Sequence, residues 1–426
     1  MEETLHGLRA AVLGAAGITV YRDVASDPAV SCCIDLLQGL VNQPGAALRE
    51  TVQRAAQFCS LLYASRFRGN FYDYLYNKVL LSDNLFAQEA ARGRWRELPD
   101  CILDAARQDL DALYRLAGIT PAALTAVLRE RFPEEALPAL PAYETAPYLY
   151  RDNGSWGGSI EELAEYYRHN GVGVFSEEIA FRFDGSRLLP VKSIDPIRLS
   201  DLKHYEAQRN KIVENTLSFL HGKPCNNILL YGDRGTGKSS TVKALLNEYY
   251  GDGLRIVQIE KKDLVAMPQL MELLADNPLK FIIFIDDLTF SENDDSYGAL
   301  KAALEGSLTK KADNTVIYAT SNRRHLIKET FTSREGDEVH RADTIDDSLS
   351  LSDRFGLTVT FMVPDKAKFL DIVLRIAQDR GLAVDEEVLL KGAERFALQK
   401  AGRSPRIARQ YIDAVQGRLE MGLPLL

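Results

Sequence analysis

The sequence predicts an α/β fold in which a parallel sheet surrounds a glycine-rich loop, with a mainly helical domain before it and a helical lid after it. Three observations support this prediction. The loop at 232–239 lies between a short apolar run and a helical pattern. The apolar runs at 281–285 and 315–322 end in polar residues, as buried parallel strands do at the edge where ligands bind. Apolar residues recur at helical spacing near both ends of the chain.

The N-terminal domain is expected to cover residues 1–165. Apolar residues follow a helical period at 49–68 and again at 103–116, and Thr120 followed by proline marks another helix start. The proline-rich stretch 133–147 indicates a linker or an extended arm.

Arginine and aromatic side chains are close in sequence within this domain. They allow two interpretations: a basic patch for nucleic acid or an acidic protein, or a solvated helix face over a core of aromatic rings. The residues concerned are Arg66, Arg68, Arg92, Arg94, Arg96, Phe71, Tyr72 and Tyr74.

A short connecting segment follows at 166–195. Residues 171–191 alternate apolar and polar side chains around Asp184 and Gly185, which predicts a β-hairpin and a linker. The nucleotide-binding core is then expected at 196–363, and a helical lid at 364–426.

The glycine-rich loop matches G-x-x-x-x-G-K-[ST], the phosphate-binding loop of nucleoside triphosphatases. Its glycines let backbone N–H groups turn toward phosphates, and the following helix adds the positive end of its dipole. Lys238 is expected to contact the β- and γ-phosphates, and the Ser239 hydroxyl is expected to bind Mg²⁺. We therefore predict ATP and Mg²⁺ as ligands. The predicted binding residues of the loop are Gly232, Asp233, Arg234, Gly235, Thr236, Gly237, Lys238, Ser239 and Ser240.

An acidic pair follows the buried run 281–285. A carboxylate at the C-terminal end of a central strand faces the crevice of an open α/β sheet. We expect Asp286 to hold the hydration shell of Mg²⁺, as the second acidic element of P-loop enzymes does. The alternative is an aspartate that only caps a turn.

The order of these elements resembles the AAA+ ATPases over roughly residues 195–420. That resemblance implies a role for several further residues. Asn322 would orient the attacking water, and Arg354 would act as an arginine finger on a neighbouring subunit. Arg406 on the lid would sense the nucleotide, with Arg403 as second choice, and Tyr205 would help to form the adenine pocket. A finger that acts on a neighbour implies a homo-oligomer.

Within AAA+ proteins, the chain resembles a bacterial group of predicted ATPases with no assigned function. Three segments carry this resemblance: 197–206, 222–227 and 350–356.

The acidic pair departs from the AAA+ pattern, which usually has glutamate as its second member to polarise the attacking water. Asp287 stands there instead, and its side chain is about 1.5 Å shorter. Because misplacing a catalytic group by about 1 Å can cost roughly 100-fold in rate, either the backbone compensates or hydrolysis is slow. Glu292 is a weaker candidate for the same role.

Composition limits the remaining possibilities. The net charge of -9 argues against a general nucleic-acid coat, although a local basic patch is compatible with it. Five cysteines without a C-x-x-C pair indicate reduced thiols, and no apolar run is long enough for a membrane span, so we expect a cytoplasmic protein. The leading function is an AAA+ ATPase that assembles or remodels an unknown protein partner. A slow nucleotide-dependent switch or scaffold, and a P-loop phosphotransferase, are the alternatives.

Overall fold

The computed structural model divides the chain into two compact units, residues 1–177 and 178–426. The structure describes residues 2–42, 48–132, 140–275, 277–290, 295–305, 313–322 and 353–424.

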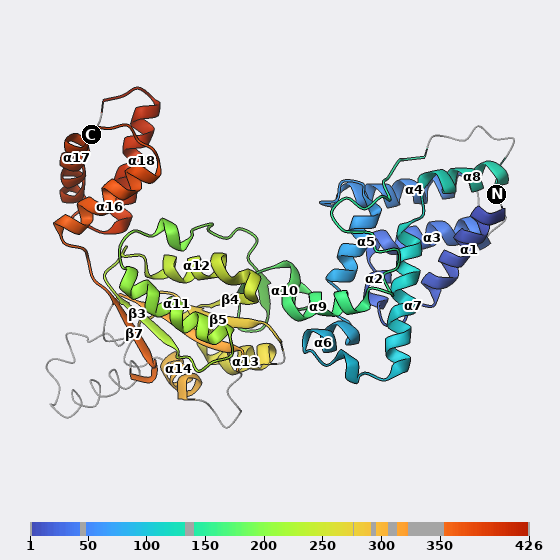
Figure 1. Cartoon of the computed structure of the whole chain (residues 1–426), viewed down its shortest axis with the longest axis horizontal. Helices are drawn as coiled ribbons and strands as arrows, with labels where there is room; N and C mark the ends of the chain where they lie inside the picture. The colour runs from blue at the N-terminus through green and yellow to red at the C-terminus, as the bar shows by residue number, and fades with distance from the viewer. Residues whose placement is uncertain are drawn as a thin grey trace. The chain divides into compact units, whose positions relative to one another are not determined.

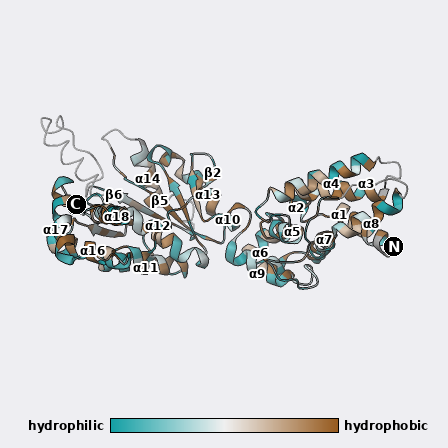
Figure 2. Ribbon diagram, turned by 90° about the horizontal axis from the view of Figure 1, so that it is seen from above, coloured by the Kyte–Doolittle hydropathy of each residue, from teal (hydrophilic) through white to brown (hydrophobic). Residues whose placement is uncertain are grey.

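The regular elements of the first unit, within its described residues, are helices (Figure 1). Its helices bury one apolar stripe each around a common core, and Figure 2 shows hydrophilic and hydrophobic residues alternating along them, as amphipathic helices require. They are α1 (Glu2–Ala16), α2 (Arg22–Ala25), α3 (Pro28–Asn42), α4 (Leu48–Tyr63), α5 (Phe71–Leu80), α6 (Leu85–Ala91), η1 (Trp95–Glu97), α7 (Asp100–Ala117), α8 (Pro121–Arg131), α9 (Ile160–Asn170) and α10 (Val174–Glu177).

A buried carboxylate fixes the first turn of this unit. One oxygen of Asp109, which is 3% exposed, accepts the backbone N–H groups of Thr19, Val20 and Tyr21 at 2.9, 2.6 and 3.1 Å. Those groups precede α2, so a side chain from α7 satisfies donors that would otherwise be buried without partners.

The aromatic residues of the possible basic patch belong to the core. Phe71, Tyr72 and Tyr74 are at most 8% exposed. Four of the five arginines lie close to carboxylates, Arg66 to Glu177, Arg92 and Arg94 to Glu89, and Arg96 to Glu161. The arrangement fits the interpretation of a solvated helix face over an aromatic core.

The second unit is built on a seven-stranded sheet in the order β2-β1-β4-β5-β6-β3-β7. All neighbouring strands run parallel except the antiparallel pair β1 and β2, which forms the hairpin predicted around Asp184 and Gly185. The strands are β1 (Ala180–Phe183), β2 (Leu188–Pro190), β3 (Ile228–Gly232), β4 (Leu254–Ile259), β5 (Lys280–Ile285), β6 (Thr315–Ser321) and β7 (Leu357–Phe361).

Helices cover both faces of this sheet, because its central strands are apolar on both sides. Residues of α11 and α12 pack with alternate strand residues in one cluster, and Figure 1 shows α12 and α13 on opposite sides of the sheet. The elements of these layers are η2 (Leu199–Asp201), α11 (Glu206–Leu220), α12 (Lys238–Tyr249), η3 (Tyr250–Asp252), η4 (Lys261–Ala266), α13 (Met267–Ala275) and α14 (Asp295–Glu305).

Three helices follow the sheet, in the segment where the sequence predicts a helical lid: α16 (Lys366–Asp379), α17 (Glu386–Gln399) and α18 (Pro405–Glu420). They share a separate apolar cluster. Each begins with an oxygen-bearing cap, Asp365, Asp385 or Ser404, whose side chain accepts a backbone N–H of the first turn. The last cap precedes proline, which suits the first position of a helix.

None of the helices among the described residues combines the length and the hydrophobicity that crossing a membrane requires.

Candidate nucleotide-binding site

The glycine-rich loop joins the end of β3 to the start of α12, as predicted. Gly232, Gly235 and Gly237 have φ of 136°, 77° and 97°, a region that side-chain-bearing residues rarely adopt. A Cβ on Gly232 would lie 2.0 Å from the carbonyl oxygen of Phe361 in β7, and one on Gly235 would lie 2.8 Å from Ser404 Oγ of the lid. The loop therefore requires glycine both for its turns and for its close contacts.

Lys238 begins α12 and points back into the loop. Its ammonium donates to the carbonyl oxygens of Gly232 and Asp233, both at 2.8 Å, and to Asn322 Oδ1 at 3.1 Å. Burial lowers the pKa of Lys238, and the nearby carboxylates of Asp233 and Asp287 oppose that shift. The lysine is 6% exposed, so a buried cation lies at the centre of the loop.

The acidic pair lies beside the loop at the end of β5. Asp286 Oδ1 accepts hydrogen bonds from Ser239 Oγ and Thr320 Oγ1, each at 2.6 Å. Asp287 Oδ1 accepts from Asn322 Nδ2, also at 2.6 Å. Sheet topology explains these contacts, since β6 lies between β3 and β5 and brings Thr320 and Asn322 to the same edge.

The amide of Asn322 links the lysine to the acidic pair. Its oxygen accepts from Lys238 and its nitrogen donates to Asp287, so one side chain contacts both groups. Three residues predicted separately from the sequence are thus joined in one hydrogen-bonded chain.

Tyr205 lies at the other end of the site, at the start of α11. Its hydroxyl donates to the carbonyl oxygen of Met362 at 2.6 Å, and its ring centroid lies 5.3 Å from that of Phe361. Burial, with a smaller contribution from the Asp233 carboxylate, raises the pKa of Tyr205 to about 12, so the hydroxyl stays protonated. Tyr205 has φ of 64°, and Arg209 of the next turn donates to the carbonyl oxygen of His204.

The helical lid closes one side of the site. The backbone N–H of Arg406 donates to the carbonyl oxygen of Gly235 at 3.2 Å, and the imidazole of His204 lies 2.6 Å from Asp371 of α16. Arg406 lines the cavity, whereas Arg403 binds Glu394 of α17 at 3.3 Å. The geometry thus supports Arg406 rather than Arg403 as the arginine that faces a nucleotide.

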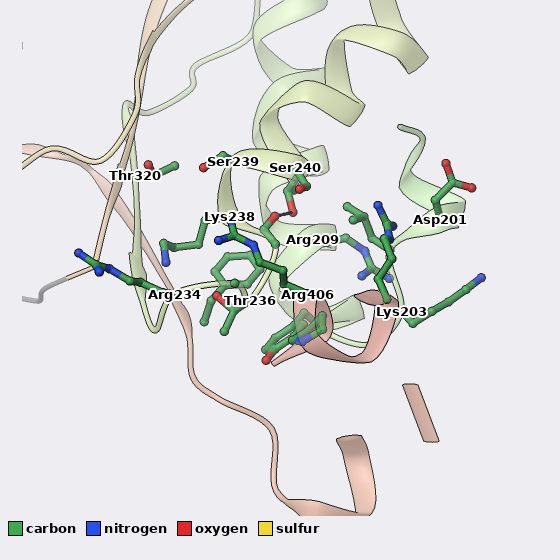
Figure 3. Close-up of a pocket in the computed structure, with 18 of the residues that line it drawn as sticks. Asp201, Lys203, Arg209, Arg234, Thr236, Lys238, Ser239, Ser240, Thr320 and Arg406 are labelled. Atoms are coloured by element: carbon green, nitrogen blue, oxygen red, sulfur yellow. Dashed lines mark hydrogen bonds between the residues drawn. The ribbon is translucent and has the colours of Figure 1, made fainter. Parts of the chain in front are cut away.

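These elements enclose a cavity of about 580 Å³. Figure 3 shows Lys238, Ser239 and Thr320 grouped apart from Asp201 and Lys203. Its lining residues are Asp201, Leu202, Lys203, Tyr205, Arg209, Arg234, Gly235, Thr236, Gly237, Lys238, Ser239, Ser240, Thr241, Asp286, Asp287, Thr320, Asn322, Phe361, Ile372, Ile376, Pro405, Arg406 and Arg409.

Some predicted residues do not line this cavity. Gly232 and Asp233 contact the edge strand and the chain after it, where Asp233 Oδ2 accepts the N–H of Val363 at 2.8 Å. Arg354 precedes β7, at the end of the sheet opposite the loop, because β7 runs parallel to β3. Glu292 and residues 350–352 lie outside the described part of the chain.

Sequence reasoning missed several lining residues: Asp201, Lys203, Arg209, Thr320 and Arg409. Thr320 had one available signal, since it lies two residues before Asn322 on the same predicted strand. The others come from η2, the segment after it, α11 and α18, and their position at the cavity depends on tertiary packing that no local pattern encodes.

The loop after β3, the acidic pair after β5 and the lid meet at one cavity, at the end of a mainly parallel sheet of the P-loop kind. The chain belongs to a family described as "Protein of unknown function (DUF815)", which matches residues 176–419.

Similar solved structures include the RuvB Holliday junction branch migration motor of Thermotoga maritima and point mutants of it. The motor is 17% identical, with a TM-score of 0.38 over 53% of this chain and 66% of that chain. One mutant is 16% identical, with a TM-score of 0.39 over 55% of this chain and 70% of that chain. No curated protein matches the chain.

Proposed function

We propose that this protein binds ATP with Mg²⁺ in the cavity, hydrolyses it, and couples both steps to the assembly or remodelling of a partner protein. One observation carries the proposal: the phosphate loop, the acidic pair, Asn322 and a lid arginine surround a single cavity.

The charge of the cavity suits a triphosphate. Basic residues outnumber acidic ones among the described lining residues, and they are contributed by the loop, α11, the segment before it and the lid. The basic residues are Lys203, Arg209, Arg234, Lys238, Arg406 and Arg409, and the acidic residues are Asp201, Asp286 and Asp287. Backbone N–H groups at the start of α12 add further donors for phosphate oxygens.

The opposite end of the cavity suits a planar base. Tyr205 and Phe361 present aromatic rings, and Ile372 and Ile376 of the lid add apolar surface. A base held there would touch the core and the lid together, so nucleotide binding would bias the lid position.

Ser239 and Asp286 are the residues that would hold Mg²⁺. Their oxygens lie 2.6 Å apart at the loop, and a hydroxyl and a carboxylate are the oxygen donors that this ion prefers. When bound, Mg²⁺ neutralises phosphate charge. No group of three or more potential metal-binding His, Cys, Asp or Glu residues is found in the described part of the chain, so this site would rely on the phosphates and water for its other ligands.

Asp287 is the proposed general base, with Asn322 holding its carboxylate. A carboxylate fixed by one hydrogen bond at 2.6 Å keeps its second oxygen for the attacking water. Asn322 also accepts a hydrogen bond from Lys238. A phosphate that binds the ammonium of Lys238 would weaken this hydrogen bond and leave Asn322 freer to move. We infer that nucleotide entry and positioning of the base are linked through this amide.

Hydrolysis would need a second subunit, because Arg354 lies far from its own loop. In the proposed homo-oligomer, Arg354 enters the neighbour's site and stabilises the charge that develops on the transferred phosphate. The partner that is remodelled is a protein of unknown identity.

Phosphate release under steady-state conditions tests this function. The proposal predicts Mg²⁺-dependent release from ATP in the absence of any acceptor. ATP binding without release would indicate the switch or scaffold, and phosphate appearing on a small-molecule acceptor would indicate a phosphotransferase. Pull-down with Asp287→Asn, which should retain ATP, is the matching test for the partner.

A further inference from the structure

The hydroxyl of Thr320 forms hydrogen bonds with both residues of the acidic pair. It donates to Asp286 Oδ1 at 2.6 Å and accepts the backbone N–H of Asp287 at 2.9 Å. Thr320 is 2% exposed, so neither bond competes with bulk water. A threonine hydroxyl can donate one hydrogen bond, and Thr320 donates it to the carboxylate of Asp286, a residue proposed to hold Mg²⁺.

The backbone of β6 continues the same contact. The N–H of Leu288 donates to the carbonyl oxygen of Thr320 at 2.7 Å, and Ser321 Oγ donates to the carbonyl oxygen of Leu288 at 2.9 Å. The regular pairing of β5 with β6 ends at Ile285 and Ala319. Beyond that point, the side chain and the backbone of Thr320 form hydrogen bonds with residues 286–288.

Asp287 itself has an unusual conformation. Its φ is 54°, in the left-handed region that residues other than glycine rarely adopt, although aspartate tolerates it better than most. Such a conformation persists where surrounding contacts hold it. Thr320 makes contacts on both sides of Asp287, to the carboxylate of Asp286 and to the N–H of Leu288.

We propose that Thr320 is a positioning residue, which uses one hydroxyl to orient Asp286 and to hold Asp287 in a left-handed turn that brings its short carboxylate to Asn322. The proposal rests on the proposed ATPase function and gives a structural reason for aspartate where AAA+ proteins usually have glutamate. The left-handed backbone turn at Asp287 compensates for the shorter reach of aspartate, whose side chain has one methylene fewer than glutamate.

The first test needs no nucleotide. Hydrogen exchange is measured by mass spectrometry on peptides that contain Asp287 and Leu288, for the wild type, Thr320→Val and Thr320→Ser. Valine keeps the shape of threonine and removes the hydroxyl. We expect exchange at Asp287 about 10-fold or more faster in Thr320→Val, and near wild type in Thr320→Ser, because a lost hydrogen bond exposes the amide. Equal exchange in all three proteins would overturn the proposal.

The second test separates turnover from binding. Thr320→Val should lower kcat by about 10- to 100-fold, as expected for a shift of about 1 Å in a catalytic group, while ATP affinity changes less than about 3-fold. Thr320→Ser should restore kcat. A lower Mg²⁺ affinity with unchanged kcat at saturating Mg²⁺ would assign Thr320 to Asp286 alone and would contradict the proposal.

Thr216→Val is the matched control. Thr216 is fully buried on α11 outside the cavity, and its hydroxyl lies within hydrogen-bonding distance of the oxygens of Ile212 and Tyr318. Thr216→Val should lower the thermal stability of the protein, as Thr320→Val does. Its kcat should stay within about 2-fold of the wild type, because Thr216 does not line the cavity. A similar fall in kcat for both variants would show a general packing effect instead.

Asp287→Glu gives the sharpest contrast with the usual AAA+ pattern. If the turned backbone compensates for the shorter side chain, glutamate overshoots Asn322 and strains the left-handed turn, so kcat should fall by about 10-fold or more. A rise in kcat would show that aspartate is only a weaker base, and the proposal would be wrong. Absence of ATP hydrolysis by the wild type would instead refute the proposed function, and the exchange test would still decide the role of Thr320.

Discussion

Replacing Lys238 by alanine tests the cavity as a triphosphate site. Lys238 is 6% exposed and its ammonium donates to three oxygens, so the ammonium points into the loop rather than into solvent. Hydrogen bonds to charged groups contribute about 1.5–3 kcal/mol each. Losing two such bonds to phosphate oxygens would cost about 3–6 kcal/mol, which corresponds to roughly 10²- to 10⁴-fold weaker binding of ATP.

The assay is a titration of Mg·ATP by calorimetry or by fluorescence of a labelled analogue. Lys243→Ala is the matched control, since Lys243 is an exposed lysine five residues further along the same helix and does not line the cavity. Circular dichroism and thermal unfolding confirm that both variants are folded. ATP affinity within about 3-fold of the wild type in a folded Lys238→Ala protein would refute the assignment of the loop, because the estimated loss is far larger.

Four further outcomes are expected. Asp287→Asn should keep Mg·ATP bound and lower turnover by about 100-fold, typical for loss of a general base, in single-turnover assays; equal loss of binding would mean that both aspartates serve the metal. Arg406→Ala should weaken ATP binding by about 10-fold or more, which is the effect of losing one charge-assisted contact. Arg403→Ala should leave ATP binding unchanged, because Arg403 binds Glu394. Equal effects of the two variants in titrations would contradict the assignment of Arg406. Arg354→Ala should bind ATP but hydrolyse it about 10³-fold or more slowly. Mixing Arg354→Ala with Lys238→Ala should restore hydrolysis, because a Lys238→Ala subunit can supply its Arg354 to a neighbour with an intact loop. No recovery of hydrolysis in mixed oligomers would contradict a role for Arg354 in the neighbouring subunit. ATP affinity should fall as pH rises through the lowered pKa of Lys238, because only the charged ammonium attracts phosphate; titrations across alkaline pH that show no decline would refute this dependence.

The parts of the site that follow local rules could be predicted from the sequence. The apolar runs 281–285 and 315–322 became β5 and β6 within one residue at each end, because buried parallel strands are apolar on both faces. The loop pattern located Lys238 and Ser239, and the polar ends of the strands located Asp286 and Asn322. These four residues all line the cavity, so local sequence patterns were enough to predict that they lie together.

The remaining features depend on long-range register. Thr320 acquires its contacts only because Ala319 is paired with Ile285, which sets Thr320 opposite the acidic pair. The left-handed turn at Asp287 could not be predicted, because such turns are usually recognised by a glycine and this position is an aspartate. Arg209 of α11 and Arg409 of α18 both line the cavity, whereas helical periodicity shows only that each helix has a polar face.

Phosphate release in a single turnover, measured with excess protein over labelled ATP across a range of protein concentrations, tests the central claim most directly. The proposed function predicts that bound ATP is converted to ADP and phosphate, and that the rate rises with protein concentration as subunits share Arg354. It also predicts that Asp287→Asn binds ATP and converts it about 100-fold more slowly. A wild-type protein that binds ATP and releases no phosphate at any concentration would contradict the claim of an ATPase.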